Sequence, residues 1–284
     1  MTKLLALIDG SIYSQSVCDH VAWVAERSGG SVEFLHVLGR RDASSAPVNL
    51  SGNLNAEARD TLLTELASLD EQKAKLAQKR GRALLAGAKE RLETAGIGEV
   101  TTKLRHGDML ETLLEFEAEA DLIVVGKRGE AADFARLHLG SNLERVLRSS
   151  HKPVLVSARA FKPVKRFLIA FDGGSSAVKA VDHVARSKTF VGLDCRLLTV
   201  GPDSPEARKR LDDATAVLRA AGYEVQADIE PGQADKVIAR RVEADGIDLM
   251  VMGAYGHSRI RSLIIGSTTT EMIRSCKIPI MLFR

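Results

Sequence analysis

A pattern of glycine and hydroxyl residues near the end of the chain has the composition of an anion-binding loop. Gly253 and Gly256 follow an apolar run, and Gly266 and Ser267 begin a segment of helical character. Glycine lets backbone approach a ligand that a Cβ would obstruct, and the N–H groups and dipole of a helix N-terminus suit a phosphate. The alternative is a tight strand-to-helix connection in which the glycines serve packing alone.

The same pattern occurs earlier in the chain, and this repetition favours the phosphate interpretation. Gly126 and Gly129 follow an apolar run at 121–125, and Gly140 and Ser141 come after them. The spacer before the Gly-Ser pair has ten residues in this copy and nine in the later one. A repeat longer than about 100 residues indicates two copies of a domain.

The elements that must position these loops alternate between short apolar runs and helical patterns. Ten runs predict strands, at 4–8, 31–37, 100–105, 121–125 and 153–156, and again at 167–171, 195–200, 224–229, 248–252 and 279–283. This alternation predicts an α/β fold with two tandem, five-stranded, parallel, doubly wound (Rossmann-like) domains. The predicted domains are residues 1–158 and 165–284.

The first half contains an insert at about 38–80 that the second half lacks. Residues 44–55 are rich in Ser, Asn, Pro and Gly and predict a loop, and a long helix is predicted from about 56 to 95. Its charged residues predict a solvated face or, alternatively, a partner-binding or dimer surface. The spacing leaves both interpretations open.

Parallel, doubly wound sheets bind ligands outside the carboxyl ends of their strands, where the strand order reverses. Asp9 and Asp172 follow the first predicted strand of each half, and Val37 and Val200 end the second. These residues and the glycine loops are therefore predicted to share one edge and to form one pocket per half. Each aspartate could also N-cap the following helix. Capping and ligand contact are compatible, so both roles are kept.

Composition limits the class of protein. The chain has 284 residues, 45% of them hydrophobic and 27% charged, with a formal net charge of +3. No apolar run approaches the length of a membrane span, and the first residues predict no secretory signal. Cys18, Cys195 and Cys276 lack metal-ligand spacing and predict core positions. We expect a cytoplasmic protein with neither nucleic acid nor a membrane as partner.

The spacing Gly-x2-Gly-x9-Gly-Ser, with an aspartate after the first strand and a Pro-Val or Pro-Ile strand at the end, resembles the nucleotide-binding signature of the universal stress protein family. The resemblance covers essentially the whole chain as two tandem copies. It implies a stress-response protein that binds adenine nucleotide: ATP, or ADP or AMP, with Mg²⁺ as an optional companion.

The resemblance also implies which residues would form each ATP site. The second-half site would comprise Asp172, Gly173, Val200, Met252, Gly253, Gly256, Gly266, Ser267, Thr268 and Thr269. The first-half site would comprise Asp9, Gly10, Val37, Gly126, Gly129, Gly140, Ser141 and Asn142. The second half is the better match, because Leu143 replaces Thr269 in the first half and the spacer there is longer. Lys127 and Arg128 could add positive charge near that first site.

The residues favour a binding and signalling module over an enzyme. The chain lacks a Walker A sequence, a kinase catalytic loop and a nucleophile elbow, so we predict no catalytic and no metal-ligating residue and at most slow ATP hydrolysis. A nucleotide-independent scaffold and a weak ATPase remain alternatives. The family resemblance further implies that strands 153–156 and 279–283 pair edge to edge in an internal pseudo-dimer, with a homodimer of whole chains as a further option.

Overall fold

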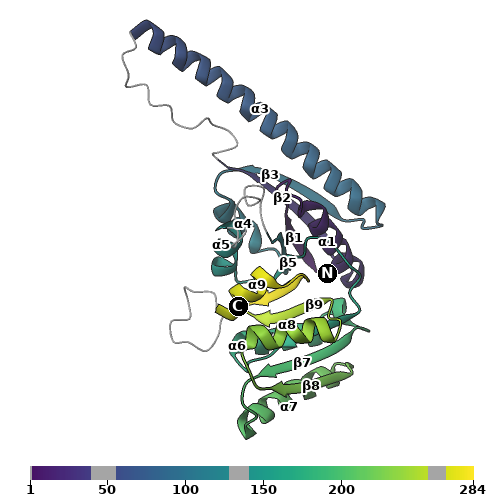
Figure 1. Cartoon of the computed structure of the whole chain (residues 1–284). Coiled ribbons are helices and arrows are strands. Elements are labelled where there is room, and N and C mark those ends of the chain that lie inside the picture. The colour runs from purple at the N-terminus through teal and green to yellow at the C-terminus, as the bar shows by residue number, and fades with distance from the viewer. Residues whose placement is uncertain (1, 40–55, 128–140, 255–266) are drawn as a thin grey trace.

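The strands of the two halves form one continuous sheet. The computed structural model describes residues 2–39, 56–127, 141–254 and 267–284. Its ten strands follow the order β3-β2-β1-β4-β5-β10-β9-β6-β7-β8 (Figure 1). Their bounds are β1 Lys3–Leu7, β2 Ser31–Leu38, β3 Val100–His106, β4 Leu122–Gly126, β5 Val154–Ser157, β6 Arg166–Ala170, β7 Asp194–Val200, β8 Val225–Glu230, β9 Leu249–Gly253 and β10 Ile280–Phe283.

Each half repeats the same strand order, and the halves meet at their last strands. The neighbouring strands within a half are parallel, whereas β5 and β10 are antiparallel, with Met281 opposite Leu155 and Leu282 opposite Val154. The predicted α/β fold, with two doubly wound units joined as an internal pseudo-dimer, is confirmed. Pairing β5 with β10 also covers two strand edges that would otherwise expose unpaired backbone groups.

Helices cover both faces of the sheet, as a doubly wound fold requires. Their bounds are α1 Ser14–Ser28, α3 Ala56–Thr94, α4 Met109–Glu117, α5 Ser141–Ser149, α6 Ser175–Arg186, a 3₁₀ turn η2 Lys188–Phe190, α7 Pro205–Ala220, α8 Ala234–Ala244 and α9 Ser267–Ser275. Local sequence starts several of them. The Asp108 carboxylate caps α4 by accepting from the N–H groups of Leu110 and Glu111, and Ser204 caps α7 ahead of Pro205.

The core consists of one hydrophobic layer on each face of the sheet. Side chains from α1, α3, α6 and α7 pack on one face, and side chains from α4, α5, α8 and α9 pack on the other. Each layer continues across the β5–β10 junction, so the halves share a core. The domain bounds 1–158 and 165–284 stay a prediction.

The long helix predicted in the insert is present, as α3, and only part of it packs on the sheet. Leu85, Ala88 and Leu92 are buried, while the N-terminal part projects away from the strands (Figure 1). Gly81 permits the close approach, since a Cβ there would come within 2.8 Å of the His36 ring. The predicted loop at 44–55 lies outside the described residues.

Candidate functional site

In the second half, the predicted residues gather where the strand order reverses. Strand β6 pairs with β7 on one side and with β9 on the other. Asp172 and Gly173 follow β6, Val200 ends β7, and Met252 and Gly253 end β9. Three neighbouring strands therefore bring these residues to one carboxyl edge, at the position where doubly wound sheets bind ligands.

The Asp172 carboxylate shapes the loop after β6. Its Oδ1 accepts a hydrogen bond from the Gly174 N–H at 2.8 Å, and the side chain is exposed. Helix α6 begins only at Ser175, with Gly174 as an N-cap that makes no side-chain bond. The N-cap alternative for Asp172 is wrong, because the two glycines place the carboxylate too far ahead of the helix, where it forms an Asx turn instead.

The first half repeats this arrangement with different neighbours. Asp9 Oδ1 accepts from the Ser11 N–H at 3.0 Å and from Ser14 Oγ at 3.4 Å. Helix α1 begins at Ser14 with Tyr13 as N-cap, so Asp9 forms an Asx turn and is not an N-cap either. Val37 is the second-last residue of β2, which continues to Leu38.

Two arginines that the sequence analysis missed lie over the Asp-Gly loops. A Cβ on Gly173 would come within 2.8 Å of Arg210 Cδ, and one on Gly10 within 3.3 Å of Arg80 Nη2. Both glycines have positive φ, 74° and 77°. The arginines come from α7 and α3, and only the register of each helix over the sheet brings them there. A charged residue within a long charged helix gives no local signal of such a position.

Gly253 and Thr269 both have packing roles in the described structure. A Cβ on Gly253 would lie 3.0 Å from Ser176 Cβ and 3.2 Å from the Ala177 nitrogen, in the first turn of α6. The buried Thr269 hydroxyl lies within hydrogen-bonding distance of the Gly253 and Ala254 carbonyl oxygens, at 3.4 and 3.3 Å. The Thr269 contacts join α9 to the end of β9. The close contact of Gly253 with α6 is what the packing interpretation expects of this glycine.

The Gly-Ser helices begin at their serines. Ser267 is the first residue of α9 and is exposed, and half-buried Thr268 follows it. Ser141 is the first residue of α5, followed by exposed Asn142. Gly126 is the last residue of β4. Four predicted residues and one cation lie outside the described residues: Gly129, Gly140, Gly256, Gly266 and Arg128. Their binding roles stay predictions.

Lys127 reaches the other half of the molecule. Its ammonium donates to the Cys276 carbonyl oxygen at 2.6 Å, directly after the end of α9. The reciprocal contact joins Arg284, after β10, to the Arg148 carbonyl at the end of α5, at 2.7 Å. Both contacts arise because β5 and β10 are antiparallel, so the carboxyl end of one half lies beside the helix C-termini of the other, whose carbonyls attract cations.

The cysteines occupy core positions, as predicted. All three are buried and free, and burial raises the pKa of Cys18 to about 11 and that of Cys195 to about 12. Their thiols are therefore protonated at neutral pH. Within the described ranges, no group of three or more His, Cys, Asp or Glu side chains could hold a metal ion, and no helix is long and apolar enough to cross a membrane.

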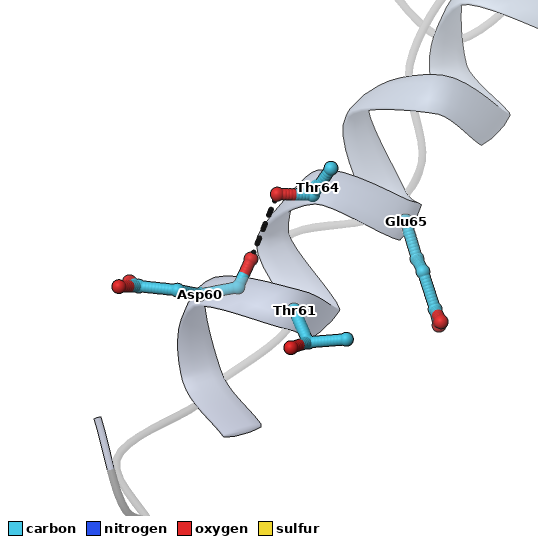
Figure 2. A pocket seen from close by; sticks show the side chains of 4 residues that line it. All are labelled: Asp60, Thr61, Thr64 and Glu65. Carbon is cyan, nitrogen blue, oxygen red and sulfur yellow. Dashed lines mark hydrogen bonds between the residues drawn. The ribbon is translucent and has the colours of Figure 1, made fainter. Parts of the chain in front are cut away.

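A hollow on α3 lies on the projecting helix, away from the residues gathered at the strand ends. Figure 2 shows its four lining residues, Asp60, Thr61, Thr64 and Glu65, all from one stretch of helix. The Thr64 hydroxyl donates to the Asp60 carbonyl at 2.9 Å, within the helix itself. One exposed helix face without converging side chains is a poor ligand site, so the strand edge remains the candidate.

Comparison with known proteins agrees with this fold. The sequence model of the universal stress protein family matches residues 1–158 and 201–284. Universal stress protein Slr1230 of Synechocystis sp. is 38% identical over 287 residues, covering 100% of both chains. A universal stress protein of Mycolicibacterium smegmatis is 26% identical over 216 residues, covering 68% of this chain and 71% of its own. The crystal structure of a universal stress protein from Archaeoglobus fulgidus has a TM-score of 0.71 at 22% identity, covering 99% of this chain and 98% of its own.

Proposed function

The chain belongs to the universal stress protein family, and from this premise we propose that it binds adenine nucleotide as a regulatory module of a stress response. The nucleotide is ATP, or its products ADP or AMP. It binds at the carboxyl edge of the strands, first in the second half, and any hydrolysis is slow.

The observation that carries the proposal is the convergence of three neighbouring strand ends at the switch point of the second half. Asp172, Val200 and Gly253 end up on one edge although 81 positions separate the first from the last. A binding crevice at this point is the general property of doubly wound sheets. The packing contact at Gly253 does not oppose binding, because one glycine can serve a close helix and a nearby ligand.

The chemistry of the described residues suits an anionic nucleotide. The N-terminus of α9 begins with exposed Ser267 and would supply N–H groups and a positive dipole end for phosphate. The arginine over Gly173, Arg210, adds a cation at the same carboxyl edge, from α7 on the opposite face of the sheet. The Asp172 carboxylate is exposed and would accept from sugar hydroxyl groups, and the Val200 backbone would meet the base.

The second half is the stronger site. The first half has buried Leu143 at the position of Thr269, so it lacks that hydroxyl group. The longer glycine spacer of the first half also changes the loop that would hold phosphate. A magnesium ion would be held chiefly by the nucleotide's own phosphates and water, since no ligand cluster occurs within the described ranges.

The experiment measures nucleotide in gently purified protein, released by denaturation and separated by chromatography. Calorimetric titration of the emptied protein with ATP and Mg²⁺ follows. About one equivalent per chain is expected from a single filled site, and about two from both. The absence of nucleotide together with the absence of binding heat would reject the proposal and favour the nucleotide-independent scaffold.

Matched aspartate variants assign the site. Asp172→Ala and Asp9→Ala each remove one Asx-turn carboxylate, and Asp9→Ala also removes the contact with the Ser14 hydroxyl. The melting temperature of each variant is therefore measured beside its ATP affinity. We expect Asp172→Ala to weaken ATP binding by about tenfold or more, the loss of a charged hydrogen bond, and Asp9→Ala to leave the stronger site unchanged. The reverse ranking would move the site to the first half. Steady ATP turnover that Asp172→Ala abolishes while binding is retained would favour the ATPase alternative.

A further inference from the structure

The projecting part of α3 carries a line of leucines. Leu62, Leu69 and Leu76 recur at intervals of seven residues, with Leu66 between the first two. Leu69 and Leu76 are 45% and 67% exposed, and Leu62 and Leu66 are half-buried. Large apolar side chains gathered on one exposed helix face indicate an interaction surface. We name Leu62, Leu66, Leu69 and Leu76 the leucine stripe.

The stripe has the repeat of a two-stranded coiled coil. Leu62, Leu69 and Leu76 occupy one of the two inward positions of a seven-residue repeat, and Leu66 begins the other, which continues as Lys73. A repeat of this period keeps one seam facing a second helix. The side chains of α3 that pack on the sheet, Leu85, Ala88 and Leu92, belong to a different line. At about 100° per residue this line is roughly a third of a turn around the helix from the stripe. Arg80 and Leu84, which continue the line of the stripe, lie against the Gly10 loop. A second helix could therefore lie along the stripe N-terminal to Arg80 while α3 keeps its own contacts.

Charge along residues 57–82 of α3 is separated into an acidic and a basic part. Residues 57–71 hold five acidic residues and one arginine, whereas residues 72–82 hold five lysines and arginines and no acidic residue. Two such helices in parallel would place like charges together. In antiparallel orientation the acidic part of each would face the basic part of the other, so α3 is complementary to itself in that orientation alone.

We propose that the projecting part of α3 is a dimer interface that binds the same helix of a second copy of this chain as an antiparallel coiled coil crossing near residue 71. Leu66 would then pack against Leu76 of the partner subunit. Glu65 flanks the seam opposite Lys79 of the partner subunit. In a parallel pair Glu65 would instead face Asp70 of the partner subunit, and the two copies of Lys73 would meet each other in the seam. The antiparallel crossing separates these two lysines and places each against Leu69 of the partner subunit.

This interface requires no nucleotide. It lies on the insert, which the second half lacks, and is separate from the β5–β10 junction that joins the halves within one chain. Dimerisation can therefore be tested independently of the proposed function, because a protein without nucleotide can dimerise and a monomer can bind ATP.

The first test measures the oligomeric state of the full chain by sedimentation equilibrium across the micromolar range. We expect a concentration-dependent dimer. Leu69→Gln/Leu76→Gln should raise the dissociation constant by about tenfold or more, since buried apolar anchors dominate interfaces. Leu114→Gln is the matched control, because Leu114 is an exposed leucine of α4, 40% exposed, outside the stripe; it should leave the dissociation constant unchanged. Circular dichroism and melting temperature establish that each variant is folded.

Charge reversal tests the orientation. Glu65→Lys and Lys79→Glu should each weaken an antiparallel dimer, and the double variant should restore it because the pair is exchanged. A parallel coiled coil would respond oppositely to Glu65→Lys, which would place a lysine opposite Asp70 of the partner subunit and tighten it. A wild-type chain that stays monomeric throughout the range would overturn the proposal. So would a dimer that none of the stripe variants weakens.

Discussion

Replacing Gly253 by alanine separates its packing role from a role in ligand approach. The new Cβ would lie 3.0 Å from Ser176 Cβ and 3.2 Å from the Ala177 nitrogen. Both atoms belong to the first turn of α6, whose backbone has little freedom to move. Overpacking of this kind costs about 1–3 kcal/mol. At about 2–4 °C per kcal/mol for a chain of this size, the melting temperature should fall measurably even without nucleotide.

Gly87→Ala is the matched control for this measurement. Gly87 is an exposed residue inside α3, and a Cβ there would meet nothing within 4 Å. The same substitution should therefore stabilise the protein by about 0.5–1 kcal/mol, the helix-propensity difference between glycine and alanine. Thermal unfolding of both variants is followed by circular dichroism with and without ATP. If Gly253→Ala melts like the wild type and loses only ATP binding, the close-packing argument is wrong.

Three further predictions concern buried polar groups. Burial lowers the pKa of His20, so protonation favours the unfolded chain and the stability present at higher pH decreases as the pH falls below about 6.5. His20→Phe should make this dependence shallower in urea unfolding; an unchanged slope would exclude His20 as its source. The three buried cysteines should react with a thiol reagent only after unfolding, and fast labelling of native protein would contradict their burial. Thr269→Val should cost about 1 kcal/mol in nucleotide-free protein by leaving carbonyl oxygens of the β9 end unpaired; equal stability would mean that the hydroxyl serves a ligand alone.

The strands could be predicted from sequence because the apolar runs were short and alternated regularly with helical patterns. Five of the ten apolar runs ended directly before an aspartate or a glycine, at Asp9, Gly126, Asp172, Gly201 and Gly253. The structure reproduces all ten runs within one or two residues. The helix of the insert was predicted at about 56–95 and spans Ala56–Thr94. What remained unpredicted was how much of it would leave the sheet, since that depends on how the helix packs over β2 and β3.

The sequence predicted the strand-end residues of the candidate site but not the cations that lie near them. Asp172, Val200 and Gly253 share an edge because strand order alone places them there. Arg80 and Arg210 depend on how far each helix slides over the sheet, and Lys127 depends on the antiparallel junction of the halves. No spacing within the chain encodes those distances. The aspartates failed as N-caps for a local reason, because two residues separate Asp172 from its helix and four separate Asp9 from its helix.

The antiparallel junction between β5 and β10 makes the molecule two-sided. The carboxyl edges of the two halves point in opposite directions, so a flat partner surface could cover one Asp-Gly loop and never both. Helix α9 begins at the carboxyl edge of its own half and ends one residue before Cys276, whose carbonyl accepts from Lys127 of the other half. A shift of Ser267 along the helix axis would therefore move the contact with Lys127, about 14 Å away at the opposite edge of the sheet.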